Sequence, residues 1–166
     1  MVQLPNQLPV NRSASVLVEA PSGVTVPDQV YITPVKPGVA SFSDGRVIAQ
    51  HGDYSLVTEA SPARSGEVIT VYLVGMGTTN PSVSAGQPSP SAEPLARPLV
   101  PPVVRVGGSE ATILYAGLTP YGIGLFQINL RIPDIGSTTG SSADFIVTQA
   151  GQVSNTTRIP IGKEVD

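Results

Sequence analysis

The stretch "ILYAGLTPYGIGLFQINLRIP", residues 113–133, decides the fold because two apolar runs flank a segment of backbone-permissive residues. Glycine or proline stands at Gly117, Pro120, Gly122 and Gly124. Proline fixes one φ angle, and glycine adopts left-handed or bulged backbone without steric cost. The pattern predicts two strands joined by a stiff β-corner. We expect the chain to pass from one sheet to another at this corner.

Apolar runs of strand length recur along the whole chain, and many alternate with period two. Turn-forming groups such as Ser-Asp-Gly and His-Gly-Asp separate them, and no window holds the 3.6-residue stripe of a helix. Short strands with regular turns indicate an all-β protein, and we predict an Ig-like β-sandwich with an additional N-terminal β-hairpin. The predicted strands are 14–20, 29–33, 38–42, 46–50, 67–74, 102–106, 111–116, 123–132, 143–149 and 156–161.

Two tyrosines, Tyr115 and Tyr121, flank the predicted corner. In Ig-like sandwiches a tyrosine at such a place buries its ring and bonds its hydroxyl to the backbone, and we interpret the pair in this structural way. The alternative is an aromatic platform for a ligand. Tyr115 and Tyr121 are therefore the candidate interaction surface of the chain.

The turns and loops differ in how strongly the sequence specifies them. Gly107-Gly108 separates "VVRV" from "ATILYA" and fits the primed turn of a tight hairpin. Residues 80–102 are rich in proline and carry no strand pattern, which predicts a long extended loop; a disordered tether between two domains is the alternative. Gly75-Met76-Gly77 follows a strand without the lysine or helix of a phosphate loop, so we interpret it as a strand end.

Composition excludes several classes of function. The 9 Lys and Arg residues are scattered, which argues against a nucleic-acid partner. The apolar runs are too short for a membrane span. Cysteine is absent, which removes disulfides and thiolate chemistry, and we expect no cofactor. No signal peptide follows Met1, and we interpret the chain as a fragment of a longer protein.

The chain contains a faint internal repeat. A shift of 129 positions places Ala14 on Ala143 and Ile32 on Ile161, with further matches of valine and isoleucine between them. Chance similarity between β-rich segments is the alternative. We divide the chain into residues 1–34, a hairpin that is the tail of a preceding repeat if the similarity is real, and residues 35–166, the sandwich. We expect the apolar hairpin to pack on the sandwich or to pair with another chain, including a homodimer, by strand addition.

No pattern points to catalysis, and we predict a protein that is not an enzyme, with no catalytic residue and no metal ligand. His51 is the only histidine and lies in a predicted turn, "QHGDYS". A serine triad would need it beside an activated serine, and a multi-histidine metal site is impossible. Asp44 and Asp53 are the two acids considered for calcium. They lack the alternating spacing of a calcium loop, and calcium binding at these two residues stays open.

Carbohydrate binding is the most specific activity that the composition leaves open. Sugar sites on sandwiches use exposed aromatic faces, yet tryptophan is absent and aromatic residues make up 5% of the chain. We expect most of the aromatic residues to belong to the core. They are Tyr31, Tyr54, Tyr72, Phe42, Phe126 and Phe145.

Several motifs together resemble a known bacterial family. "SGEVITVYLVGMGTTNP" (65–81), "VRVGGSEATILYAGLTPYGIGLFQINLRIP" (104–133) and "GQVSNTTRIPI" (151–161) follow one another in the order of the Solibacter-type uncharacterised C-terminal domain. The resemblance implies an Ig-like module of large secreted proteins, with no activity attached. We therefore expect a non-catalytic structural or protein-interaction module of an exported bacterial multidomain protein. It would be secreted or at the cell surface, and its partners would be neighbouring domains or another chain. A carbohydrate- or surface-binding module is the alternative, with a glycan as partner.

Overall fold

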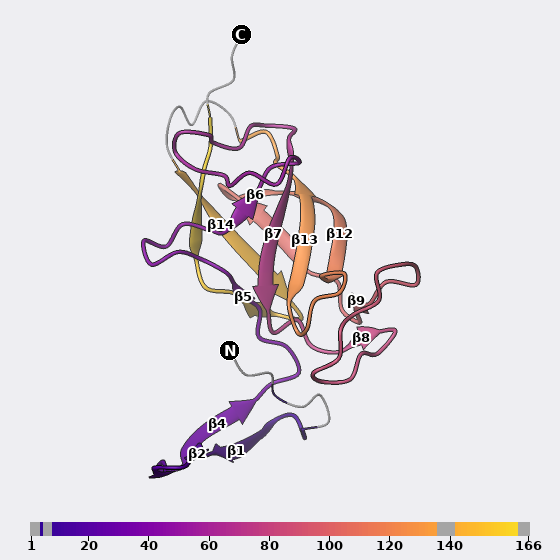
Figure 1. The fold of residues 1–166 in the computed structure, drawn as a ribbon. Helices are drawn as coiled ribbons and strands as arrows, with labels where there is room; N and C mark the ends of the chain where they lie inside the picture. The colour runs from indigo at the N-terminus through magenta and orange to yellow at the C-terminus, as the bar shows by residue number, and fades with distance from the viewer. Residues whose placement is uncertain (1–3, 5–7, 136–141, 163–166) are drawn as a thin grey trace.

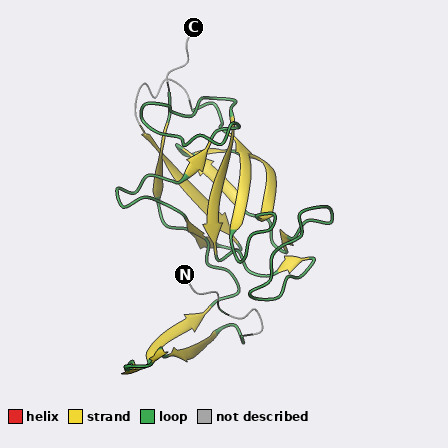
Figure 2. Ribbon diagram, viewed as in Figure 1, coloured by secondary structure: helices red, strands yellow, loops and turns green. Residues whose placement is uncertain are grey.

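The structure is a computed structural model that describes residue 4 and residues 8–135 and 142–162. These residues form strands and loops and contain no helix, which confirms the predicted all-β class (Figure 2). Because the described part holds no helix, it also holds none long and apolar enough to cross a membrane.

Ten strands form two five-stranded sheets within the described residues. In the first sheet the order is β12-β13-β7-β5, with β6 also paired to β7. Its strands are β5 (Gly38–Val39), β6 (Ala49–Gln50), β7 (Val68–Val74), β12 (Thr112–Leu118) and β13 (Phe126–Arg131). In the second sheet the order is β11-β10-β14-β15, with β16 also paired to β14. Its strands are β10 (Val103–Val106), β11 (Ser109–Glu110), β14 (Ser142–Gln149), β15 (Gln152–Val153) and β16 (Thr157–Pro160).

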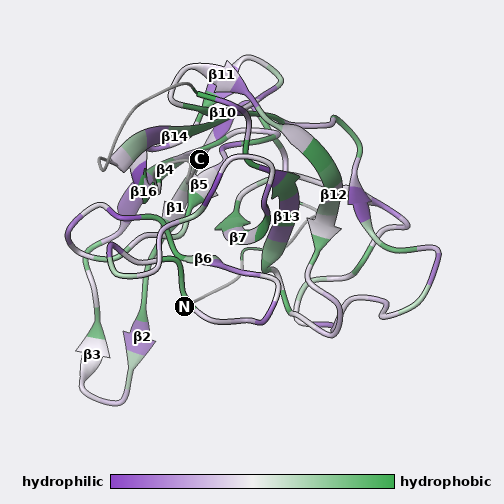
Figure 3. Cartoon of the chain, turned by 90° about the horizontal axis from the view of Figure 1, so that it is seen from above, coloured by the Kyte–Doolittle hydropathy of each residue, from purple (hydrophilic) through white to green (hydrophobic). Residues whose placement is uncertain are grey.

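One apolar core joins the two sheets. In β7 and β14 every second side chain is buried, as expected for strands that cover a core with one face. Side chains from both sheets belong to the same buried cluster, among them Val71 and Ile128 from the first sheet and Phe145 from the second. Figure 3 looks along the layers, with β10 and β14 on one side and β7, β13 and β12 on the other.

The corner at residues 117–124 has a different role from the one that we predicted. Strands β12 and β13 pair with each other, with Leu118 opposite Phe126, so the segment between them returns the chain within one sheet. The prediction of a passage between sheets at this point was wrong. The two apolar runs are neighbours in one ladder, and the chain changes sheet earlier, at Ala111 between β11 and β12.

The predicted hairpin at Gly107-Gly108 is confirmed. Val106 pairs with Ser109, and both glycines have positive φ angles, 57° and 85°. These angles match the primed turn, whose twist suits an antiparallel pair. Residues 80–102 form a long loop as predicted, except that β8 (Thr79–Asn80) pairs with β9 (Arg97–Pro98), a short strand that the sequence did not predict.

Residues 12–32 form a separate structure that we call the N-terminal ribbon. Strands β1 (Arg12–Val16) and β4 (Asp28–Ile32) pair antiparallel, and β2 (Glu19–Ala20) pairs with β3 (Gly23–Val24) further out. Figure 1 shows the N-terminal ribbon projecting from the end of the two sheets. Val18 remains 60% exposed and Val26 88% exposed, so the outer part of the N-terminal ribbon does not pack on the two sheets; pairing with another chain stays a prediction.

The segment that follows the N-terminal ribbon, residues 34–36, makes a close backbone contact with the end of β7. The Lys36 amide donates a hydrogen bond to the Gly75 carbonyl, at 2.8 Å. A Cβ on Gly75 would lie 2.0 Å from the Lys36 carbonyl oxygen, and one on Gly77 would lie 2.7 Å from the Pro34 carbonyl oxygen. Both glycines also have positive φ angles, so the Gly75-Met76-Gly77 strand end serves a tight packing of chain on chain.

Candidate functional site

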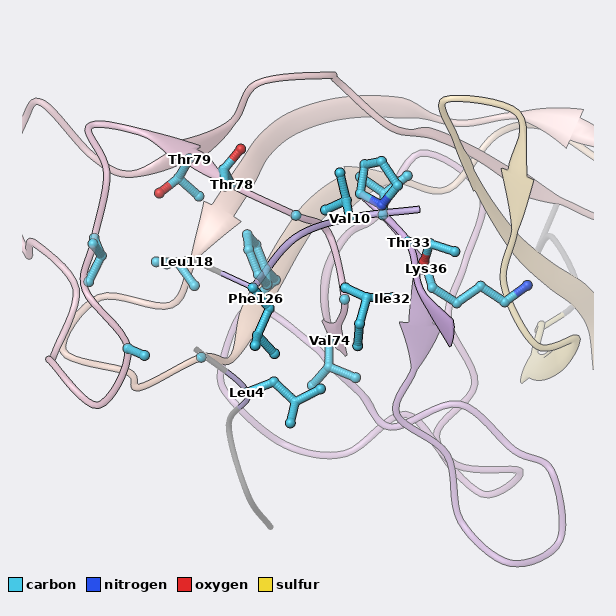
Figure 4. Close-up of a pocket in the computed structure, with 18 of the residues that line it drawn as sticks. Leu4, Val10, Ile32, Thr33, Lys36, Val74, Thr78, Thr79, Leu118 and Phe126 are labelled. Atoms are coloured by element: carbon cyan, nitrogen blue, oxygen red, sulfur yellow. The ribbon is translucent and has the colours of Figure 1, made fainter. Parts of the chain in front are cut away.

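An apolar groove lies between the base of the N-terminal ribbon and the adjacent end of the first sheet. Its volume is about 960 Å³. Val10 and Ile32 line it from the ribbon side, and Val74, Leu118 and Phe126 line it from the sheet side (Figure 4). We call it the basal groove.

The chemistry of the basal groove is that of an apolar contact surface. Among its lining residues, Lys36 and Tyr31 are the only ionisable ones, and the Lys36 ammonium extends away from the apolar side chains in Figure 4. The Thr79 hydroxyl is already committed, since it donates to the Pro81 carbonyl at 2.8 Å. The described lining holds no carboxylate or imidazole, so it offers no pair for general acid–base catalysis.

The N-terminal ribbon carries further exposed apolar surface, away from the basal groove. Val16, Leu17 and Val18 are consecutive, and each is more than a third exposed. Strands β1 and β4 form a two-stranded sheet, so within the described residues each has one edge without a ladder partner. A free edge beside exposed apolar side chains is a template for pairing with a further strand.

His51 lies in a polar cluster that resembles a catalytic triad in its spacing. Its Nδ1 atom is 2.5 Å from Glu67 Oε1, and its Nε2 atom is 3.3 Å from Ser61 Oγ. The cluster was missed in the sequence because Ser61 and Glu67 approach His51 only after the loop between β6 and β7 folds back.

The same geometry argues for a structural clamp. His51 Nε2 is also 3.1 Å from the Ser61 carbonyl oxygen, which requires a proton on that nitrogen. Donation to both Glu67 and the carbonyl needs the imidazolium, and the hydrogen bond to Glu67 raises the pKa of His51. In this protonation state the ring cannot accept the proton of Ser61, and His51 links Glu67 to the Ser61 backbone.

The acids that we considered for calcium are engaged in their own turns. Asp44 Oδ1 accepts the Arg46 amide, and Asp53 Oδ1 accepts both the amide and the hydroxyl of Ser55. The Ser55 bonds lower the pKa of Asp53. Nowhere in residues 8–135 and 142–162 do three or more His, Cys, Asp or Glu residues gather into a group that could hold a metal ion.

The two tyrosines of the corner have different environments. The Tyr115 hydroxyl donates to the Leu118 carbonyl at 2.8 Å, and the Arg97 guanidinium lies over its ring. Burial raises the pKa of Tyr115. A Cβ on Gly117 would collide with that hydroxyl, which explains the glycine at this position. Tyr121 is 76% exposed at a φ of 61°, so it is the member of the pair that is presented to solvent.

The expectation that most of the aromatic residues belong to the core needs a correction. Phe126 and Phe145 are buried, but Tyr31 is 62% exposed and Tyr54 is 80% exposed. Tyr31 shares a face of the N-terminal ribbon with serine and glutamine side chains, and Tyr54 lies in a turn with a φ of 68°. Neither position faces the core between the two sheets.

Comparison with family models, with curated proteins and with solved structures finds no match.

Proposed function

We propose that this chain is a non-catalytic structural or protein-interaction module of an exported bacterial multidomain protein. Its partners are neighbouring domains of the same protein or another protein chain. The proposal includes the finer fold assignment: an Ig-like sandwich over residues 35–166, preceded by a hairpin over residues 1–34. The resemblance of residues 65–161 to a module of secreted proteins supports the secreted or cell-surface location.

One observation carries the proposal. The N-terminal ribbon presents Val16, Leu17 and Val18 to solvent on strands with free edges, and an apolar groove lies at the base of the ribbon. Apolar surface of this kind is costly to leave in water and is typical of a surface that contacts another protein. The polar cluster at His51 supports the same view, because His51 links Glu67 to the Ser61 backbone and so ties the two ends of a loop together.

A hydrolase assay tests the non-catalytic role. The full chain and the variants Ser61→Ala and His51→Gln are incubated with chromogenic esters, peptides and glycosides. We expect no turnover above buffer in any of the three. Turnover by the full chain that both substitutions abolish would contradict the proposal, because it would show that the His51 cluster is a working triad.

Limited proteolysis tests the structural role. A rigid sandwich resists cleavage because a protease needs a locally opened chain, whereas the projecting N-terminal ribbon has little packing to protect it. We expect the first cuts within residues 12–33 and a stable fragment that begins near Pro34. Early cutting in β7 or β14 would contradict the module as a rigid spacer.

A glycan- or surface-binding module is the second candidate, and the exposed tyrosines favour it. Tyr31, Tyr54 and Tyr121 each present a ring to solvent, and sugar-binding sandwiches stack pyranose rings on such faces. Titration with plant and bacterial polysaccharides, followed by tyrosine fluorescence, tests this candidate. A saturable change that is lost in Tyr54→Ala or Tyr121→Ala would favour it over a purely structural role.

A further inference from the structure

The N-terminal ribbon has the same strand pairing as the last hairpin of the second sheet. We call strands β14, β15 and β16, residues 142–160, the C-terminal hairpin. Adding 129 to each residue number of the ribbon converts its pairs into those of the C-terminal hairpin. The pairs Ser13↔Tyr31, Ala14↔Val30, Ser15↔Gln29, Val16↔Asp28, Glu19↔Val24 and Ala20↔Gly23 become Ser142↔Pro160, Ala143↔Ile159, Asp144↔Arg158, Phe145↔Thr157, Thr148↔Val153 and Gln149↔Gln152.

A side-chain hydrogen bond repeats at the same spacing. In the N-terminal ribbon the Val18 amide donates to the Thr25 hydroxyl at 3.0 Å, and the Thr25 amide donates to the Val18 carbonyl at 2.9 Å. In the C-terminal hairpin the Val147 amide donates to the Ser154 hydroxyl at 3.0 Å, and the Ser154 amide donates to the Val147 carbonyl at 2.9 Å. In both hairpins a hydroxyl side chain accepts the amide at equivalent positions, between the two paired segments of the ladder. Chance similarity between two strands would not reproduce this hydrogen bond, so it supports a true repeat.

The two hairpins differ in what covers them. Val147 is fully buried, because β10 pairs along its strand, with Val104 opposite Val147, and the first sheet covers its face. Its counterpart Val18 is 60% exposed. The N-terminal ribbon therefore keeps the pairing of a sandwich hairpin but lacks both an edge strand like β10 and a facing sheet.

We propose that the N-terminal ribbon is the last hairpin of a preceding copy of this module in the same polypeptide. That copy would provide an edge strand like β10 along residues 16–19 and an apolar sheet over Val16 and Val18. This inference rests on the proposed function and names the partner as a like module that lacks its own last hairpin. The chain connection favours a copy in the same polypeptide. In this module the chain enters the C-terminal hairpin directly from β13, a strand of the facing sheet. The chain that enters the N-terminal ribbon would come in the same way from the facing sheet of the preceding copy.

A tandem protein tests the inference. Residues 35–135 are joined directly to residue 7 of the chain, which continues to residue 166. Residue 7 then occupies the position of residue 136, so the N-terminal ribbon stands where the first unit would have its own hairpin. The matched control joins residues 35–162 to the same residue 7, and its first unit keeps a C-terminal hairpin of its own.

Hydrogen exchange of the peptide that covers residues 16–19 is measured in both tandems, together with their unfolding curves and masses. We expect at least about 100-fold slower exchange in the first tandem than in the control, with both units folded in each. Replacing Val18 by aspartate should remove this protection in the first tandem and leave the control unchanged. Such a result would establish the N-terminal ribbon as the missing hairpin.

Three outcomes would overturn the inference. The residue 16–19 peptide could exchange equally fast in both tandems, or the first unit could stay unfolded in the first tandem while it folds in the control. The third outcome is protection in the control with a doubled mass, which would assign the N-terminal ribbon to pairing between separate chains. Each outcome leaves the hydrolase assay unaffected, so failure of this inference is distinguishable from failure of the non-catalytic role.

Discussion

The N-terminal ribbon and the C-terminal hairpin pair their strands in the same register, yet only the second belongs to a core. Phe145 and Val147 are fully buried, whereas their counterparts Val16 and Val18 are 37% and 60% exposed. Strand pairing is set by alternation and by turns over short distances, whereas burial depends on a partner that lies far away in the sequence. The comparison separates these two contributions within one chain, since the same local structure occurs with and without a covering sheet.

The sharpest way to break the comparison is to place a charge at the two equivalent valines. Val147→Asp puts a carboxylate into the core between the sheets, and we expect it to cost about 4 kcal/mol or more and to unfold the module. Val18→Asp should change the free energy of unfolding by at most about 0.5 kcal/mol. Urea unfolding of both variants measures the difference. Equal losses would mean that the N-terminal ribbon is already covered in the isolated chain.

A second prediction concerns the contact between the end of β7 and the segment that follows the N-terminal ribbon. Gly75→Ala drives a methyl group against the Lys36 carbonyl in a left-handed backbone, and we expect a loss of about 2–3 kcal/mol in stability. The matched control is Gly45→Ala, where φ is +84° but nothing lies within 4 Å of the added Cβ. That change should cost only about 1 kcal/mol of backbone strain. Thermal unfolding compares the stability losses of the two variants. Equal losses would show that the close contact with Lys36 does not cause the loss in Gly75→Ala.

The repeated hydroxyl provides a smaller test. Ser154→Ala leaves the buried amide of Val147 without its partner, and we expect it to cost about 1–2 kcal/mol. Thr25→Ala removes the equivalent bond in the exposed ribbon, where water replaces it, and should cost at most about 0.5 kcal/mol. Chemical denaturation of each variant gives both values. A larger loss for Thr25→Ala would contradict the difference in covering.

The smallest effect should come from pH, and it should arise in the sheets and their loops rather than in the N-terminal ribbon. The Glu67 hydrogen bond raises the pKa of folded His51 above its ordinary value of 6.5, so protonation favours the folded state. The stabilisation is complete below that ordinary value and is lost as the pH rises through the native pKa. Unfolding followed between pH 5.5 and pH 8.5 should show this decline in the full chain.

His51→Gln and Glu67→Gln provide the controls for the pH effect. Both should flatten the dependence, since neither variant keeps a histidine that gains a carboxylate partner on folding. An unchanged slope in His51→Gln would assign the dependence to another group.

The sequence predicted the parts of the fold that local patterns determine. Alternation in β7 and β14 placed the buried faces, and Gly107-Gly108 placed a primed turn, because both signals act within a few residues. The sheet change near Ala111 was not predictable in this way, since the run from Ile113 to Leu118 would alternate equally well in either sheet. The assignment of β12 to a sheet depends on which strand lies beside it.

The candidate site was less predictable than the fold. The base of the N-terminal ribbon and the end of β7 lie far apart in the sequence and meet only in the folded chain, so no spacing could indicate the basal groove. The exposure of Tyr31 and Tyr54 has the same origin, because a tyrosine on an alternating segment looks identical whether a sheet covers it or not. At the corner the predicted passage between sheets was wrong, but Tyr115 bonds its hydroxyl to the backbone as expected, because its partner Leu118 lies only three residues away.

The contact of Gly75 and Gly77 with the segment before β5 has a consequence for the geometry of longer assemblies. The direct contact of the two backbones fixes where residues 34–36 leave the end of β7. If each ribbon completes the unit before it, this point of departure would recur in every unit. A string of such units would then repeat the same connection between successive modules, and its length would be counted in modules.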